Sequence, residues 1–298
     1  VPREQARAAA LRAEVTALLQ KQAIEEVLDV DQPGFYSHLF VVPKPGGRWR
    51  PVIDLSVLNT FIAAPHFRME TSRALRQAIR CNEYAVSLDL TDAYLHIPMH
   101  RSTKRYLRFA IDGRIFAFRA LPFGLNLSPW AFTRIMDAVV AYVRRSTSSE
   151  ISNYLDDLLQ KNLDPQVLAG DLQFLMGCLQ KLGFLVNLAK SDLVPSRDFV
   201  HLGMHFQTAL GSVSLPVKRQ DKLLSAISVL LSQELTTPRQ VSQVLGLCAA
   251  AAELIPLGRL HLRPIQWAFR DLWDQTTAAW DSTISVSDDL RAALLTWT

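Results

Sequence analysis

The sequence predicts an α+β fold, with antiparallel strands backed by helices in the first two thirds and a helical region after them. Two pairs of short apolar segments, each pair separated by polar residues, predict β-hairpins at residues 38–55 and 151–159. Apolar residues recur at helical spacing near the start of the chain and again after residue 210. These patterns predict a strand-rich body followed by a helical bundle.

Composition bounds the class of protein. The chain has 298 residues, of which 49% are hydrophobic and 20% charged, so it is expected to be globular with two or three subdomains. The net charge of +4 permits a polyanionic partner without requiring one. No apolar run reaches the length of a membrane span, and no secretory leader is visible.

The cysteines and the chain ends suggest the origin of the protein. The three cysteines, Cys81, Cys178 and Cys248, fit no CxxC pattern and are expected to be reduced thiols. That expectation favours an intracellular protein, cytoplasmic or nuclear. A start at Val1 without Met suggests a piece of a longer polyprotein.

The first elements follow from local pattern. Helical spacing of apolar residues predicts a packing helix over residues 3–22. Strands are expected at 38–43 and 51–55, a helix at 72–79 and a buried strand at 84–90. In the first hairpin, Lys44 near the turn and Arg50 on the returning strand place two cations where a triphosphate could lie. The alternative is a solvated basic turn.

The stretch 151–159 carries two adjacent carboxylates, Asp156 and Asp157, at or next to the tip of its hairpin. Two part-buried anions repel each other and stay ionised only beside a cation. Mg²⁺ is the natural candidate because it takes oxygen ligands and keeps positions open for phosphates. Taken alone, such a pair is more often an exposed acidic turn.

A third carboxylate, Asp89, ends the strand predicted at 84–90. A lone Asp in that place is usually a cap or turn residue. If the strand lies beside the 151–159 hairpin, however, three carboxylates meet. Such a set could bind two metal ions about 3.5–4 Å apart, the arrangement used for in-line phosphoryl transfer.

Six segments in order, covering about residues 15–255, resemble the reverse transcriptases of retroelements. They are WRPVIDL (49–55) with LN (58–59), SLDLTDAY (87–94), LPFGL (121–125) with SP (128–129), YLDD (154–157), LGF (182–184) with Asn187 and Lys190, and FVHLG (199–203). One such segment is a weak signal, but six in the right order are a strong one. The resemblance is to the polymerases of LTR-type and DIRS-type retrotransposons. Within that group, the segments KRYLRF (104–109) and FT (132–133) are more similar to DIRS-type than to gypsy-type elements.

The resemblance implies roles for particular residues. Catalytic and metal-binding roles fall to Asp89, Asp156 and Asp157, with Mg²⁺ as the cofactor and Mn²⁺ as the alternative. Binding of the deoxynucleoside triphosphate (dNTP) falls to Lys44, Arg50, Tyr94, Phe123 and Lys190. Contact with primer and template falls to Tyr154, Leu155, Leu202, Gly203 and Met204.

Two of these assignments have a physical rationale of their own. An aromatic ring at Tyr94 would clash with a 2′-hydroxyl and thereby favour deoxynucleotides, although plain packing is the alternative. Phe123 is expected to pack near the nascent base pair rather than to hydrogen-bond with it. No GxxxxGK[ST] loop or nucleophile elbow is present, which leaves P-loop and acyl-transfer readings without support.

The resemblance also implies a right-hand polymerase with fingers at 1–63 and 97–127, palm at 64–96 and 128–210, and thumb with the start of a connection at 211–298. Helices are expected from Val217 and again from a capping box at Thr237-Pro238-Arg239-Gln240. A ribonuclease H domain is expected downstream in the full polyprotein.

The implied function is primer extension by nucleotidyl transfer on an RNA or DNA template. The implied partners are an RNA template, a DNA primer and dNTPs, with no membrane. Two alternatives remain open: an RNA-dependent RNA polymerase, and a catalytically inactive nucleic-acid-binding relic of the same fold.

Overall fold

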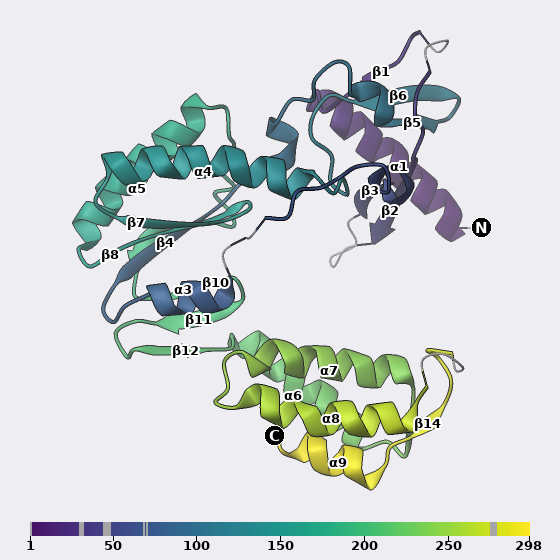
Figure 1. Cartoon of the computed structure of the whole chain (residues 1–298), viewed down its shortest axis with the longest axis vertical. Coiled ribbons are helices and arrows are strands. Elements are labelled where there is room, and N and C mark those ends of the chain that lie inside the picture. The colour runs from purple at the N-terminus through teal and green to yellow at the C-terminus, as the bar shows by residue number, and fades with distance from the viewer. Residues whose placement is uncertain (1, 30–32, 44–48, 68, 70, 275–278) are drawn as a thin grey trace. The chain divides into compact units, whose positions relative to one another are not determined.

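The chain folds into two compact units, the first comprising Val1–Glu70 and Tyr84–Pro195, the second Thr71–Glu83 and Ser196–Thr298. The structure is a computed structural model that describes residues 2–29, 33–43, 49–67, 69, 71–274 and 279–298 (Figure 1). None of the described helices combines the length and the apolar character needed to cross a membrane.

A four-stranded sheet forms the centre of the first unit. Its strand order is β7-β8-β4-β9, with β7 at Glu150–Tyr154, β8 at Asp157–Asn162, β4 at Tyr84–Asp89 and β9 at Asp192–Ser196. Strand β8 pairs antiparallel with both β7 and β4. The helices α4 (Ser128–Ser146) and α5 (Pro165–Lys181) pack along one face of this sheet (Figure 1).

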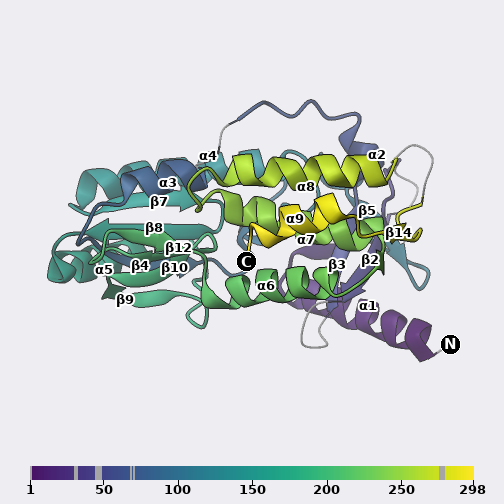
Figure 2. The same cartoon turned by 90° about the horizontal axis from the view of Figure 1, so that it is seen from below.

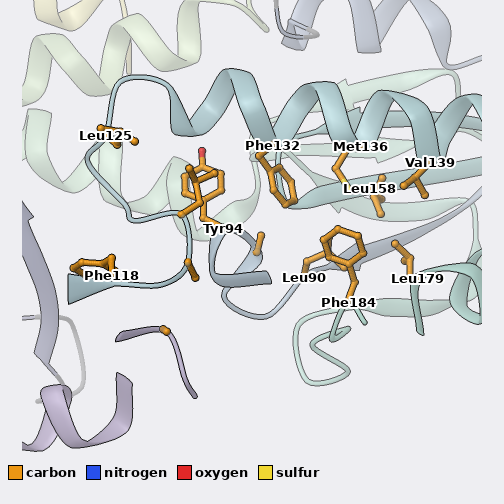
Figure 3. Packing of buried hydrophobic residues seen from close by; sticks show 14 of the residues in the cluster. Leu90, Tyr94, Phe118, Leu125, Phe132, Met136, Val139, Leu158, Leu179 and Phe184 are labelled. Carbon is orange, nitrogen blue, oxygen red and sulfur yellow. The ribbon is translucent and has the colours of Figure 1, made fainter. Parts of the chain in front are cut away.

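The core between these helices and the sheet follows from helical spacing. Buried side chains on α4 recur every three or four residues: Phe132, Met136, Val139, Val140 and Val143. The same spacing holds on α5: Leu168, Leu172, Leu175 and Leu179. Figure 3 shows Phe132, Met136 and Val139 on the side of α4 that faces Leu158 of β8. Burial of each such side chain contributes roughly 1.5–3 kcal/mol.

The remainder of the first unit surrounds helix α1 (Pro2–Gln20). One antiparallel hairpin joins β2 (His38–Pro43) to β3 (Trp49–Asp54), and the short helix α2 (Ser56–Asn59) follows it. A second, three-stranded sheet has the order β1-β6-β5, from Ile24–Glu26, Arg114–Phe118 and Arg108–Ile111. The first unit also contains two 3₁₀ turns, η1 (Ala93–His96) and η2 (Lys104–Tyr106).

The second unit has its own core. A helical bundle contains α6 (Val217–Leu231), α7 (Pro238–Ala252), α8 (Gly258–Leu272) and α9 (Asp288–Leu295), which lie alongside one another (Figure 2). Two short strands, β13 (Leu235–Thr236) and β14 (Ile284–Ser285), pair antiparallel beside it. The rest comprises α3 (Ser72–Ala78) and the antiparallel sheet of β10 (Asp198–His201), β11 (Met204–Gln207) and β12 (Ser212–Ser214).

The structure confirms the predicted elements where patterns were strong. Both hairpins, the buried strand at 84–90, the helix at 72–79 and the helical last third are present within one to four residues of the predicted bounds. The capping box forms: the Thr237 hydroxyl accepts from the Gln240 backbone, and the Gln240 side chain accepts from the Thr237 N–H. The three cysteines are unpaired, as expected.

Candidate active site

Three carboxylates meet at one end of the four-stranded sheet. Antiparallel pairing of β4 with β8 sets Asp89 directly opposite Asp157. Tyr154 pairs with Asp157, so Leu155 and Asp156 form the two-residue loop between β7 and β8. The backbone N–H of Leu90 donates to the Asp156 carbonyl at 3.0 Å, which ties this loop to the end of β4. The sequence prediction that these acids converge is confirmed.

The loop between β7 and β8 holds a strained residue. Leu155 has φ 55°, in the left-handed region. That conformation costs an L-residue with a Cβ roughly 1–2 kcal/mol. Hairpin loops of two residues need positive φ to match the twist of the strands, and glycine usually supplies it. The pairing on both sides of the loop therefore holds Leu155 in place and with it fixes the backbone of Asp156.

The electrostatics of the carboxylates favour a bound cation. Burial, and then the charges of Asp156 and Asp89, raise the pKa of Asp157 to about 6. Burial is also the main cause that raises the pKa of Asp156, with repulsion from Asp89 adding to it. The charge of Lys190 acts in the opposite direction on both groups. Additional positive charge at this place would lower the pKa of both carboxyl groups and relieve their mutual repulsion.

The donor set suits a hard divalent cation in its chemistry, since carboxylate oxygens are the ligands that Mg²⁺ takes. The geometry is less complete. Within the described ranges, no group of three or more His, Cys, Asp or Glu side chains is arranged to hold a metal ion. Asp89, Asp156 and Asp157 are thus neighbours with oxygen donors and unfavourable mutual repulsion, but they do not form a closed ligand cage.

The loop before β9 supports Asp89 from the other side. The N–H of Asn187 donates to the Asp89 carbonyl at 2.8 Å, and the Asp89 N–H donates to the Ser191 hydroxyl at 3.0 Å. This brings the Lys190 ammonium to 3.5 Å from both carboxylate oxygens of Asp89. Lys190 remains 67% exposed, so it keeps donors free for another anion. Sequence reasoning missed Ser191, for which the pattern offers no signal.

A cavity of about 410 Å³ opens beside the carboxylates. The predicted site residues that line it are Asp89, Asp156, Arg50, Phe123 and Lys190. The structure therefore brings two catalytic candidates and three nucleotide-binding candidates around a single space. Lys44, the other predicted triphosphate contact, lies outside the described residues.

Two aromatic rings occupy one side of this cavity. Phe123 is 40% exposed, and the Arg50 guanidinium lies 5.7 Å from its ring centre. Tyr94 is 9% exposed and packs between Phe123, at 4.8 Å, and Phe132, at 5.4 Å between ring centres. Figure 3 shows Tyr94 next to Phe132. Tyr94 is not among the described residues that line the cavity. Its ring packs against Phe123 on the side away from the cavity. Tyr94 therefore makes the packing contacts that the sequence predicts as the alternative to a steric gate.

The loop that carries Phe123 is held by Asn59. The Asn59 amide donates to the Gly124 carbonyl at 2.8 Å and accepts from the Asn126 N–H at 2.9 Å. Gly124 has φ 94°, which residues with a Cβ rarely adopt, and a Cβ there would lie 3.2 Å from the Ile53 carbonyl oxygen. These contacts explain why segments 58–59 and 121–125 lie together.

The predicted primer and template contacts fall in both units. Tyr154 and Leu155 belong to the β7–β8 hairpin, whereas Leu202 and Gly203 form the two-residue loop between β10 and β11 in the second unit. Both loop residues have positive φ, 47° and 73°, as a type I′ turn requires. Met204 is only 4% exposed, which leaves the backbone and Leu202 as the accessible part of this turn.

Helix α1, which the sequence marked only as a packing helix, contributes to the cavity. Lys21, directly after α1, lines it and forms an ion pair with Asp92 at 2.8 Å. Glu14 also lines it. Sequence reasoning missed these residues because the charged face of an amphipathic helix looks the same whether it faces solvent or a site.

The sequence is similar to parts of retroviral and retrotransposon polyproteins. It is 26% identical over 221 residues to the Pro-Pol polyprotein of Simian foamy virus type 1, which covers 73% of this chain and 18% of that protein. It is 23% identical over 287 residues to the Retrovirus-related Pol polyprotein from transposon opus of Drosophila melanogaster, which covers 95% of this chain and 27% of that protein. The chain thus spans less than a third of the length of these relatives.

The fold is similar to that of solved foamy viral protease-reverse transcriptases. One structure, in complex with double-stranded DNA, matches with a TM-score of 0.76 and 21% identity over 94% of this chain and 45% of that one. Another, in complex with an RNA/DNA hybrid, has a TM-score of 0.75 and 21% identity over 95% of this chain and 35% of that one. At this identity the likeness shows the fold, and it confirms the predicted α+β polymerase class.

A family model described as "Reverse transcriptase (RNA-dependent DNA polymerase)" matches residues 42–206, just over half of the chain. The matched region contains all three carboxylates. It also contains every residue from Trp49 to Lys190 that lines the cavity. The chain therefore belongs to the reverse transcriptase (RNA-dependent DNA polymerase) family of retroelements.

Proposed function

We propose that this chain is the polymerase part of a reverse transcriptase, which extends a DNA primer on an RNA or DNA template by nucleotidyl transfer from dNTPs. One observation carries the proposal above the others. Asp89, Asp156 and Asp157 meet at one end of the sheet, beside a cavity that Arg50 and Lys190 also line. Anionic oxygens for a metal and cations for a triphosphate thus lie next to each other.

Each group has a proposed task. Asp89, Asp156 and Asp157 would hold Mg²⁺, or Mn²⁺ in its place. The bound cation would supply charge neutralisation at the reacting phosphate and lower the pKa of the primer 3′-hydroxyl. Arg50 and Lys190 bind the phosphates of the incoming nucleotide, and Lys44 is proposed for the same task. Lys190 also lowers the repulsion between the carboxylates before substrate arrives.

The aromatic pair would select the sugar. The exposed face of Phe123 lines the cavity, and the ring of Tyr94 fixes the position of Phe123 from behind. A 2′-hydroxyl placed against this wall would lose its hydration without gaining a hydrogen-bond partner. Deoxynucleotides are favoured on that basis, which supports DNA rather than RNA synthesis.

The partners are proposed from the family. The similar foamy viral enzymes bind double-stranded DNA and an RNA/DNA hybrid, so a template–primer duplex is the proposed macromolecular substrate. Tyr154, Leu155 and the turn at Leu202 and Gly203 would contact its backbone, with Met204 packing beneath that turn. Fingers at 1–63 and 97–127, palm at 64–96 and 128–210, and thumb at 211–298 are the proposed divisions. A ribonuclease H domain downstream and an intracellular location, cytoplasmic or nuclear, belong to the same proposal.

Primer extension on an RNA template tests the function. Wild-type protein should extend a DNA primer with dNTPs and Mg²⁺, whereas the Asp156→Asn variant should give no product because it loses one anionic ligand and keeps the size of the side chain. Circular dichroism of the variant checks that it still folds. Extension by Asp156→Asn at the wild-type rate would show that the site has been misassigned.

Two alternatives give different results in the same assay. An RNA-dependent RNA polymerase would use ribonucleoside triphosphates in preference to dNTPs. A catalytically inactive relic would retain template–primer on a filter but add no nucleotide in either Mg²⁺ or Mn²⁺.

A further inference from the structure

An ion pair lies in the wall of the cavity beside the carboxylates, at a place that the proposed reaction does not use. The Lys21 ammonium lies 2.8 Å from a carboxylate oxygen of Asp92, and both side chains line the cavity. Lys21 follows α1, whereas Asp92 lies three residues beyond Asp89. The pair therefore joins the helix to the segment that carries the first catalytic carboxylate.

The charge of the cavity makes this pair relevant to nucleotide affinity. Besides Asp89 and Asp156, two carboxylates are among the described lining residues, Glu14 and Asp92. An incoming triphosphate is strongly anionic and would be repelled by each of them. Lys21 neutralises Asp92, the carboxylate three residues beyond Asp89. Its own side chain is 50% exposed and keeps two donors beyond the one used on Asp92.

The turn at Asp92 is closed by a backbone hydrogen bond as well as by the side-chain ion pair. Asp92 has φ 49° and ψ 42°, in the left-handed region, where Asp and Asn are tolerated better than most residues. Its carbonyl accepts from the Leu95 N–H at 2.8 Å, which closes the turn locally. Asn at this position can keep the turn while removing the charge, so charge and geometry can be separated.

We propose that Lys21 sets the affinity for the incoming dNTP by neutralising Asp92, and thus acts as a positioning residue through that carboxylate. The inference rests on the proposed function and deepens it. Without Lys21, Asp92 is an unpaired carboxylate in the wall of the cavity, and its negative charge repels the triphosphate that binds there. The loss of affinity should then disappear when Asp92 is made neutral as well.

The chain contains a matched control for this pair. Arg12 of α1 forms an ion pair with Asp112 at 2.7 Å, and Asp112 also has φ 49°. Both side chains of that pair are exposed, as those of the Lys21 pair are, and neither is among the described residues of the cavity. It joins the same helix to another loop of the first unit, so it reports any general effect of losing such a link.

Equilibrium binding of a radiolabelled dNTP tests the proposal. The protein is loaded with a template–primer whose primer ends in a dideoxynucleotide, because a primer without a 3′-hydroxyl cannot react. We expect Lys21→Ala to weaken binding roughly tenfold, the scale of one contact with a charged group at a partly exposed site. Lys21→Arg and Arg12→Ala should stay within about twofold of wild type, since the charge in the cavity is kept.

The double variant decides between neutralisation and direct binding. Lys21→Ala with Asp92→Asn should regain affinity to within about twofold of wild type. With an ordinary primer, the Lys21→Ala change should fall on KM and leave kcat nearly unaltered. Thermal unfolding of each variant, with Lys21→Gln as a second replacement, shows whether a weak binder is folded.

Three results would overturn the proposal: wild-type affinity in Lys21→Ala, equal loss in Arg12→Ala, or no recovery in the double variant. Each differs from failure of the proposed function. If the polymerase assignment is wrong, wild-type protein itself neither binds the dNTP nor extends the ordinary primer.

Discussion

The side chain of Asp157 is held where its own charge is unfavourable. It lies opposite Asp89, next to Asp156 and half-buried, and these surroundings raise its pKa to about 6. In the unfolded chain the pKa lies near the ordinary 3.8. The folded chain therefore binds a proton there more tightly than the unfolded chain, and the free energy of unfolding falls as pH rises from about 3.8 to about 6. Above that range the full penalty of the charge remains.

We therefore expect Asp157→Asn to stabilise the metal-free protein at pH 7.5 and to change little below about pH 3.8. The gain should be on the order of 1 kcal/mol, since solvent screens a half-buried group. Denaturant unfolding in a metal chelator, below about pH 3.8 and at pH 7.5, measures it.

Asp137→Asn serves as the control, because Asp137 is an exposed carboxylate on α4 away from the site. It should leave the free energy of unfolding at pH 7.5 within about 0.5 kcal/mol of wild type. A lower stability of Asp157→Asn at pH 7.5 would contradict the view that the carboxylates repel one another in the folded state.

At the scale of one element, the start of α7 shows how a four-residue sequence motif determines where a helix begins, away from the carboxylate site. Thr237 caps the helix, Pro238 occupies its first turn, and Gln240 returns a hydrogen bond to the Thr237 N–H. The Thr236 hydroxyl donates to the same Gln240 oxygen at 2.8 Å. The side chains of Thr237 and Gln240 thus satisfy two backbone N–H groups that the helix cannot pair by itself, and Thr236 holds the Gln240 side chain in place.

Thr237→Ala should lower the free energy of unfolding of the second unit by about 1 kcal/mol, because the first turn of α7 loses its cap. Hydrogen exchange of the Gln240 and Val241 amides measures this directly and should become faster. Thr237→Ser keeps the hydroxyl and should exchange almost as wild type does. Unchanged exchange in Thr237→Ala would mean that packing alone holds this end of α7.

At the scale of the whole molecule, local patterns predicted the parts of the fold that depend on neighbouring residues. Apolar runs bounded by turns gave β4 and the β7–β8 hairpin, and the capping box gave α7. The meeting of Asp89 with Asp157 is non-local, and its prediction depended on the resemblance to a family. The finer assignment to DIRS-type elements stays a prediction.

Contacts between distant segments account for what was missed. Lys21 reaches Asp92, and Ser191 accepts from Asp89, across separations that no periodicity reports. The association of residues 71–83 with the C-terminal unit is of the same kind. Tyr94 was predicted either to act as a steric gate or simply to pack, and its motif did not indicate that its ring would lie between Phe123 and Phe132.

Single-turnover addition of one dNTP to a DNA primer on an RNA template tests the central claim most directly, with Asp89→Asn, Asp156→Asn and the double variant compared with wild type. Groups that act as one catalytic unit are not additive. Each single variant should lose at least about 10³-fold in rate, and the double variant should be hardly slower than either. If either single variant added the nucleotide at the wild-type rate, these carboxylates would not be the groups that carry out the reaction.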